Sequence, residues 1–174
     1  MRIEAVTVRP AIAEDIELLA DIHDAAWRNA YRGILPGVEL ERLLGRRGVS
    51  WWDAAIRYKM RILVIDVCGA TAGYATFGHT RLKHLPFPGE IYELYMDPDH
   101  QGLGFGRKLF SATRAALRAA GMPGFAVRVL KENEQAQAFY EAMGGLLYDE
   151  SVERIGRSDV SVLIFGWTDR PAER

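Results

Sequence analysis

The stretch from Glu90 to Phe110, "EIYELYMDPDHQGLGFGRKLF", decides the fold of this chain. Its first residues, "EIYELYMD", are rich in apolar and aromatic side chains and are closed by Asp97-Pro98, which predicts a strand. Three glycines follow at alternate positions, Gly102, Gly104 and Gly106, and then "RKLFSATRAALRAAG" has the apolar spacing of a helix that stops at Gly121. The sequence therefore predicts a strand, a glycine-rich loop and a helix in direct succession.

The loop allows three interpretations. A helix start with free N–H groups and a positive end is receptive to phosphate. A P-loop requires Gly-Lys-Ser/Thr, whereas Gly106 is followed by Arg-Lys-Leu, and the spacing G-x-G-x-G departs from the G-x-G-x-x-G of dinucleotide-binding folds. The remaining alternatives are a turn that serves only packing, or a phosphate-binding loop of another kind.

Outward from this stretch, the pattern predicts a mixed α/β domain around one largely antiparallel sheet. The strand-helix-strand unit around the loop makes Tyr92–Met96 and Phe125–Leu130 parallel neighbours. The other expected elements are a strand at Val6–Arg9, a helix within Ala13–Tyr31, a short helix after Pro36, a further helix within Arg46–Lys59, a hairpin turning near Gly69, a short helix capped by Asn133, and a final antiparallel pair within 145–168.

Composition narrows the class of protein. The chain has 174 residues, 49% of them hydrophobic, which predicts one domain over 1–174 with a core of about 6–169 and a short C-terminal tail. The net charge of -1 argues against a nucleic-acid partner. No apolar run reaches the length of a signal peptide or of a membrane span, so we expect no membrane partner.

The number and positions of the cysteine and histidine residues bear on the cellular compartment and on metal binding. The single cysteine, Cys68, forms no internal disulfide, which suits a reducing compartment and predicts a cytoplasmic location. The four histidines are scattered along the sequence, so we expect no metal site. The oligomeric state stays open, with a homodimer as one option.

The loop and the segment after it resemble the GNAT acetyltransferase superfamily. Gln101-x-x-Gly104-x-Gly106, between "LYMDPD" and "RKLF", resembles its acyl-CoA pyrophosphate loop. Downstream, "VRVLKENEQAQAFYEAMGG" is similar to its next segment, with Asn133 and Tyr140 in the expected order. The best agreement covers Glu90 to Gly145, and the order of elements extends it to nearly the whole chain. Gly145 departs from the pattern, because these proteins usually carry a bulky aromatic residue there.

The resemblance implies acetyl-CoA as co-substrate, no metal, and a sheet splayed between its central strands with helices on both faces. Pantetheine would lie in the splay against the backbone of Leu94, Tyr95 and Met96, with the Leu94 N–H as donor to the thioester carbonyl. Asn133 would hold the pantetheine arm; its simpler role is that of a helix cap, and it can serve in both. The pyrophosphate would lie against the loop of Gln101, Gly102, Leu103, Gly104, Phe105, Gly106 and Arg107, whose backbone N–H groups from Gly102 onward would bind it. Arg107 or Lys108 would add positive charge; the alternative is that both are solvated residues of the helix surface.

For catalysis, the resemblance makes Tyr140 the general acid that protonates the departing thiolate; the alternative is a core tyrosine. The base is Glu93 or Glu90, which strand alternation places on opposite faces of the sheet. Glu93 is preferred because it is nearer to the expected acyl carbonyl. Attack by an amine without a base, or with water alone, is the remaining option.

We expect the acceptor to contact Trp27, Tyr31 and Arg32, although the first two also suit a helix core. The implied activity is transfer of an acetyl group to a primary amine of a small molecule or peptide by direct attack on the thioester. A non-catalytic acyl-CoA-binding or sensing domain is the alternative, and a nucleotide-binding module is a third.

Overall fold

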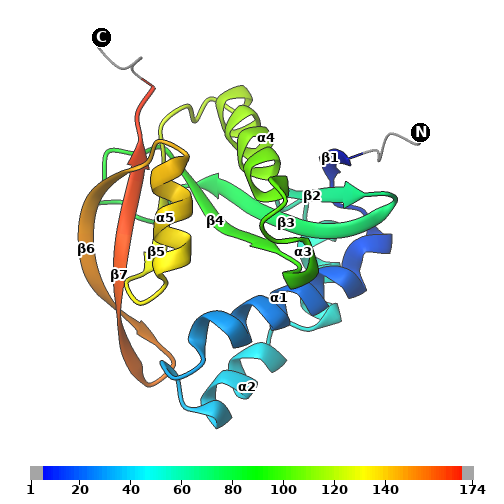
Figure 1. Cartoon of the computed structure of the whole chain (residues 1–174), viewed down its shortest axis with the longest axis horizontal. Helices are drawn as coiled ribbons and strands as arrows, with labels where there is room; N and C mark the ends of the chain where they lie inside the picture. Colours follow the sequence, from blue (N-terminus) through cyan, green and yellow to red (C-terminus); the bar gives the residue numbers. More distant parts are fainter. Residues whose placement is uncertain (1–5, 170–174) are drawn as a thin grey trace. The chain divides into compact units, whose positions relative to one another are not determined.

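The computed structural model describes residues 6–169, so the expected C-terminal tail at 170–174 lies outside the described residues. The chain divides into two compact units, and Figure 1 labels the helices and strands that they contain. The first contains the described residues up to Thr76 together with Glu93–Thr113, and the second contains Phe77–Tyr92 and the described residues from Arg114 onward. The backbone therefore passes from one unit to the other three times.

The first unit is built on an antiparallel meander. β1 (Val6–Pro10) pairs with β2 (Ile62–Val67), and β2 pairs with β3 (Ala70–His79), whose last residues belong to the second unit. The turn between β2 and β3 places both Cys68 and Gly69 at positive φ, 53° and 83°. Two such residues in succession match the turn that a right-twisted hairpin prefers, so the predicted hairpin is confirmed.

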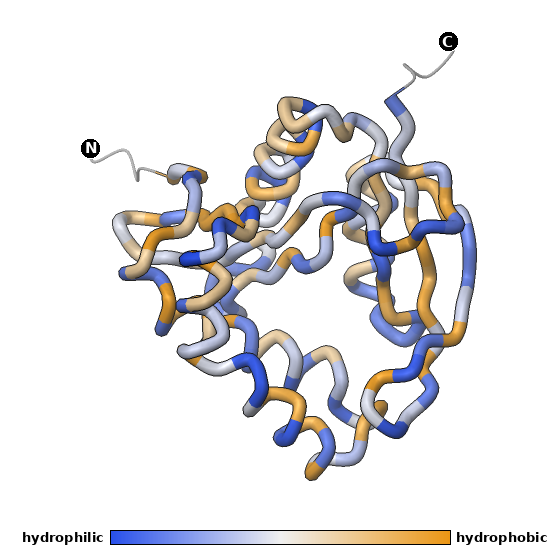
Figure 2. The backbone as a smooth tube through the Cα atoms, turned by 180° about the vertical axis from the view of Figure 1, so that it is seen from behind, coloured by the Kyte–Doolittle hydropathy of each residue, from blue (hydrophilic) through white to orange (hydrophobic). Residues whose placement is uncertain are grey.

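Helices of the first unit bury one face each. They are the short η1 (Ala13–Asp15), α1 (Ile16–Tyr31), α2 (Gly37–Gly45) and α3 (Val49–Arg57). Hydrophilic and hydrophobic stretches alternate along their backbones in Figure 2, as amphipathic helices require. No helix within residues 6–169 is long and apolar enough to cross a membrane.

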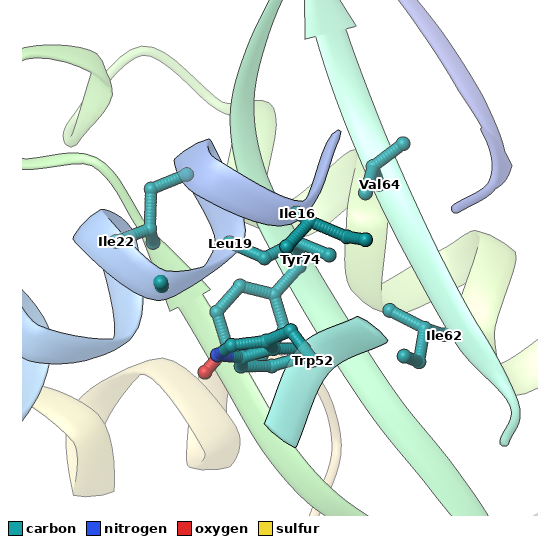
Figure 3. Close-up of a cluster of buried hydrophobic side chains, with 8 residues drawn as sticks. Ile16, Leu19, Ile22, Trp52, Ile62, Val64 and Tyr74 are labelled. Carbon is teal, nitrogen blue, oxygen red and sulfur yellow. The ribbon is translucent and has the colours of Figure 1, made fainter. Parts of the chain in front are cut away.

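The main apolar core of the first unit lies between α1, α3 and the meander (Figure 3). Trp52 and Tyr74 are fully buried at its centre, with their rings edge to face and 5.0 Å apart. A second cluster joins Ile65 and Ala75 of the meander to Met96 and Leu109. Leu109 belongs to α4 (Phe105–Ala119), so this cluster fixes the start of the helix that follows the glycine loop.

A buried carboxylate ties the first elements together. Asp15 accepts hydrogen bonds from Arg9 Nη1 (2.8 Å) and Nη2 (2.9 Å), from the Ile12 N–H (2.8 Å) and from Thr71 Oγ1 (3.1 Å). Burial favours the neutral acid, but Arg9 and these donors outweigh it and lower the pKa of Asp15. One side chain thereby links β1, η1 and β3.

The second unit contains the parallel strand pair and the final hairpin. Gly89–Ile91 of β4 (Gly89–Met96) pair in parallel with Phe125–Val127 of β5 (Phe125–Leu130). β5 then pairs antiparallel with β7 (Ser158–Trp167), which pairs with β6 (Leu146–Ile155). The remaining helix of this unit is α5 (Glu134–Ala142).

The predicted parallel step is confirmed in direction and corrected in register. We expected Tyr92–Met96 to lie beside β5, whereas the paired residues of β4 are Gly89–Ile91, three residues earlier. Gly89 fits there because the β5 side is crowded: a Cβ on it would lie 3.2 Å from the Gly124 carbonyl oxygen. The strand order of the seven-stranded sheet is β1-β2-β3-β4-β5-β7-β6, so the expected mixed and mostly antiparallel α/β fold is confirmed.

Trp167 explains the unusual glycine at position 145. A Cβ on Gly145 would lie 2.5 Å from Cζ2 of the Trp167 indole. That indole stacks on Phe125 with ring centroids 4.8 Å apart and donates from Nε1 to the Met143 carbonyl oxygen (3.1 Å). The last strand therefore supplies an aromatic ring at this place, and position 145 has no room for a side chain of its own.

Candidate functional site

The glycine loop owes its glycines to backbone conformation. Gly102 and Gly104 have φ of 74° and 84°, values that L side chains rarely adopt. A Cβ on either residue would meet no other atom within 4 Å, so close packing does not require them. Gly106 lies within α4, so only two of the three alternate glycines form the loop.

The end of the loop can receive an anion. The first turn of α4 contains no acidic residue, and its N–H groups have no partner within the helix. The Arg107 side chain is exposed there, whereas Lys108 donates from Nζ to the Val6 carbonyl oxygen (2.7 Å). Of the two basic residues, Arg107 is the one whose charge is available beside the loop.

The strand before the loop contributes to both cores of the first unit. Leu94 and Met96 pack in the cluster around Leu109, while Tyr95 faces the other cluster, with its ring 5.8 Å from that of Tyr74. Gln101 returns to this strand and donates from Nε2 to the Met96 carbonyl oxygen (3.3 Å). The loop is thus fastened to the end of β4.

Glu93 lies at the centre of a polar cluster in the first unit. Its carboxylate accepts two parallel hydrogen bonds from Arg47, Nη1 to Oε1 (3.0 Å) and Nη2 to Oε2 (3.1 Å). Oε2 also accepts from Thr76 Oγ1 (3.2 Å) and from the Tyr74 hydroxyl (3.4 Å). Burial and the Glu93 charge raise the pKa of Tyr74, so this phenol stays a donor.

His23 faces the same carboxylate. Its Nε2 lies 3.9 Å from Glu93 Oε1 and has no hydrogen-bond partner, and its Nδ1 lies 3.4 Å from Asp24 Oδ1. Burial lowers the pKa of His23 to about 4; the Glu93 carboxylate opposes this change and the Arg47 charge adds to it. The imidazole is therefore neutral at pH 7.

Aromatic rings surround this cluster. Along α1, the rings of His23, Trp27 and Tyr31 lie in a row, with centroids 5.2 Å and 4.7 Å apart. The Arg47 guanidinium lies 3.7 Å from the Trp51 ring centroid and 5.0 Å from that of Trp52. His23 and Arg47 contact the Glu93 carboxylate, and the rings of Trp27, Tyr31, Trp51 and Trp52 extend from these two side chains as an aromatic frame.

Of the three expected acceptor residues, two join this frame. Trp27 is partly buried against His23, and Tyr31 is buried beside Trp27. Arg32 is exposed just beyond the end of α1 and forms a short bridge with Leu35. His23 and Arg47 were not among the site residues predicted from the sequence. His23 occupied an apolar helix position, and no signal near Arg47 pointed to a partner 46 residues away.

Glu90, the other candidate base, lies in a closed network of the second unit. It is fully buried and accepts hydrogen bonds from the Arg81 N–H (2.8 Å) and from Arg128 Nε (3.1 Å). Arg128 also pairs with Glu153 (3.1 Å). Burial of Arg128 acts to lower its pKa, but the carboxylates of Glu90 and Glu153 outweigh burial and raise it. Both oxygens of this carboxylate are therefore paired within the second unit.

Tyr140 and Asn133 belong to α5. Asn133 caps this helix by accepting a hydrogen bond from the Ala136 N–H (3.0 Å), which confirms the simpler of its expected roles. Tyr140 is buried, and its ring contacts Phe139 and Trp167 edge to face. Burial raises the pKa of Tyr140, so its hydroxyl keeps its proton.

The described residues offer no set of side chains suited to bind a metal ion. Among residues 6–169, no group of three or more His, Cys, Asp or Glu side chains is arranged to hold a metal ion.

Comparison with known proteins identifies the family. The model of the acetyltransferase (GNAT) family matches residues 19–145. The chain belongs to this family. The match includes the glycine loop, both candidate glutamates and Tyr140, and so confirms the resemblance found in the sequence.

Three similar proteins illustrate the relationship. The uncharacterized N-acetyltransferase YuaI of Bacillus subtilis (strain 168) is 29% identical over 167 residues, 96% of this chain and 95% of that protein. The L-amino acid N-acyltransferase MnaT of Escherichia coli (strain K12) is 29% identical over 55% of this chain and 56% of its own length. The PaiA N-acetyltransferase from Thermoplasma acidophilum, solved in complex with coenzyme A, superposes with a TM-score of 0.74 over 94% of this chain and 99% of that chain at 17% identity.

Proposed function

We propose that this protein transfers an acetyl group from acetyl-CoA to a primary amine of a small molecule or peptide. The observation that carries the proposal is the loop at Gly102 and Gly104, whose bare backbone leads into a helix start without an acidic side chain. Such a place suits a pyrophosphate. Membership of an acetyltransferase family, the N-acyl transfer named for YuaI and MnaT, and coenzyme A in the PaiA complex support the choice of co-substrate.

In this proposal the backbone does most of the binding. N–H groups from Gly102 to Arg107 hold the pyrophosphate, and the Arg107 side chain adds a positive charge. The backbone of Leu94–Met96 holds the pantetheine arm, with the Leu94 N–H donating to the thioester carbonyl oxygen. Asn133 has spare amide donors beyond its capping bond and contributes to the same arm.

The reaction is a direct displacement. The neutral amine attacks the thioester carbon, negative charge develops on the carbonyl oxygen beside the Leu94 N–H, and the C–S bond then breaks. Loss of one such donor costs about 3–4 kcal/mol of transition-state stabilisation in other enzymes. The amine nitrogen loses a proton to a base, and the departing thiolate takes one from Tyr140, so an amide and free coenzyme A result.

Glu93 is the base in this scheme. Its carboxylate contacts His23 and Arg47, next to the aromatic frame that contains Trp27 and Tyr31, whereas Glu90 is fully buried and paired with Arg81 and Arg128; this difference supports Glu93. The cytoplasmic location, the single-domain organisation over 1–174 and the homodimer option stay predictions.

The decisive experiment is an assay of free thiol with acetyl-CoA and a broad panel of amines. Thiol release with at least one amine, at a rate well above hydrolysis, is the expected result. Acetyl-CoA binding without thiol release for any amine would instead support the alternative, an acyl-CoA-binding or sensing domain.

Replacement of Tyr140 by Phe tests the proton donor. Turnover should fall about 100-fold or more because the thiolate then leaves without a proton, while the Kd for coenzyme A changes little. Stopped assays give kcat, and calorimetry gives the Kd. Tyr148→Phe, at an exposed tyrosine that packs on Phe87, is the matched control and should keep full turnover. Equal kcat in wild type and Tyr140→Phe would remove the assigned role.

A further inference from the structure

Buried nitrogen atoms without partners gather around Glu93. Within residues 6–169, five buried side-chain N or O atoms have no hydrogen-bond partner, and four of them are His23 Nε2, Trp27 Nε1, Trp52 Nε1 and Arg47 Nε. Ring contacts join His23 to Trp27 and Trp52, and Arg47 lies against Trp52. Buried polar groups normally have partners, so such a concentration calls for a ligand that supplies them.

One part of this cluster suits an amine. In the tautomer that carries its proton on Nδ1, neutral His23 donates to Asp24 Oδ1 (3.4 Å), and the lone pair of Nε2 then faces Glu93 Oε1, 3.9 Å away. Two acceptors at this separation are bridged by a single donor atom with two or more protons, at about 2.9 Å from each. A primary amine or ammonium has that number of protons.

The other part suits a carboxylate. Arg47 already binds the Glu93 carboxylate with both terminal nitrogens, and its Nε is unused. It lies in the short connection between α2 and α3, and its guanidinium stacks on Trp51. A guanidinium presents the same fork to a carboxylate on a small molecule as to one on the protein.

We propose that the acceptor of this enzyme is an amino carboxylate, bound by partner exchange. Its amine donates hydrogen bonds to Glu93 Oε1 and His23 Nε2, and its carboxylate accepts hydrogen bonds from Arg47. The Arg47–Glu93 pair opens as the acceptor enters. The exchange leaves each charge paired, whereas an amine without a carboxylate would leave Arg47 buried and unpaired. This inference rests on the proposed function and names the class of its acceptor.

The test compares each amino acid with the same amine lacking its carboxylate. The pairs are L-phenylalanine with 2-phenylethylamine and L-leucine with 3-methylbutylamine, assayed by thiol release from acetyl-CoA with the full chain. We expect kcat/KM to favour the amino acid by about 10–100-fold, because the amine that lacks the carboxylate leaves one buried polar group without its partner.

Arg47→Met should reduce this preference to within about threefold, because no buried guanidinium is then left unpaired by an amine that lacks the carboxylate. Arg28→Met is the matched control, because Arg28 forms the same two-bond pair with Glu41 on the exposed surface. It should keep the preference.

The preference is a ratio measured on one protein, so partial loss of folded enzyme does not affect it. If Arg47→Met does not fold, Arg47→Lys keeps the charge over Trp51 and should lower the preference at least about threefold, since lysine lacks the fork.

Equal kcat/KM for both members of each pair in the wild type would overturn this inference and leave the proposed function standing. A preference that survives in Arg47→Met would do the same. Absence of thiol release with every amine would overturn the proposed function itself.

Discussion

At the scale of single residues, His23 is the clearest example of a group held against its ordinary chemistry. It is fully buried between Trp27 and Trp52, and burial lowers its pKa from 6.5 to about 4. The native state therefore leaves His23 neutral at a pH where the unfolded chain protonates it. Below pH 6.5 the unfolded state binds the additional proton, so stability falls as the pH falls toward 4.

This linkage predicts a measurable slope. Between pH 7 and pH 5, His23 alone should reduce the free energy of unfolding by about 2 kcal/mol, read from urea denaturation at each pH. His23→Gln removes the titrating group and should show a smaller loss over the same interval by that amount. His84→Gln, at an exposed histidine, is the control. Parallel pH profiles for wild type and His23→Gln would contradict the assignment.

Single residues also show where sequence reasoning ended. Gly102 and Gly104 could be predicted because glycine is the residue that positive φ requires, and Asn133 because a cap acts on its own helix. Arg47 could not, since its partner Glu93 lies 46 residues away in the chain and is brought to it only by tertiary packing. The same is true of Gly145: the Trp167 ring fills the space beside it, and these two residues are far apart in the chain.

At the scale of helices and strands, local signals predicted the elements and part of their pairing, and missed the register of β4 and the place of β7 in the sheet. Turn residues near Gly69 and the stop at Gly121 act on their neighbours, so the hairpin and the end of α4 agree with the sequence. The register of β4 on β5 depends on which residues tolerate a close approach, and β7 lies between β5 and β6 although it follows both in the chain.

Asp15 is the side chain on which several of these elements depend. Asp15→Asn removes the charge that pairs with Arg9 and places two amide protons beside existing donors, so we expect the free energy of unfolding to fall by about 2–4 kcal/mol. Chemical denaturation measures it. Asp53→Asn, in an exposed pair with Arg57 on α3, is the control and should cost less than about 1 kcal/mol. A similar small cost for both variants would show that the Asp15 network contributes little.

At the scale of the whole molecule, the proposed co-substrate should act as a stabiliser. A ligand that binds only the native state at about 100 times its Kd adds about 2.7 kcal/mol to the free energy of unfolding. Acetyl-CoA should therefore raise the Tm by several degrees, whereas NAD and ATP at equal concentration should not, because the loop lacks both of their fingerprints. Differential scanning calorimetry measures the shift.

The loop variant Gly104→Ala sharpens that measurement. It adds a Cβ at a φ of 84° with no neighbour within 4 Å, so it perturbs the backbone conformation without a clash. The variant should lose most of the acetyl-CoA shift. Gly33→Ala, at the same kind of φ after α1 and also in open surroundings, controls for the strain itself. A full shift in Gly104→Ala, or a larger one with NAD or ATP, would contradict the proposed use of the loop.

The tryptophans give this molecule an optical property of its own. Three of the four, Trp27, Trp51 and Trp52, lie in the first unit around His23 and Arg47, and only Trp167 lies in the second. Indole emission responds to a cation at 3.7 Å and to a neighbouring imidazole, so the chain carries its own fluorescent reporter at the Arg47–Glu93 pair. With Trp167 replaced by Phe, every photon emitted by tryptophan would come from the surroundings of that pair, without a label.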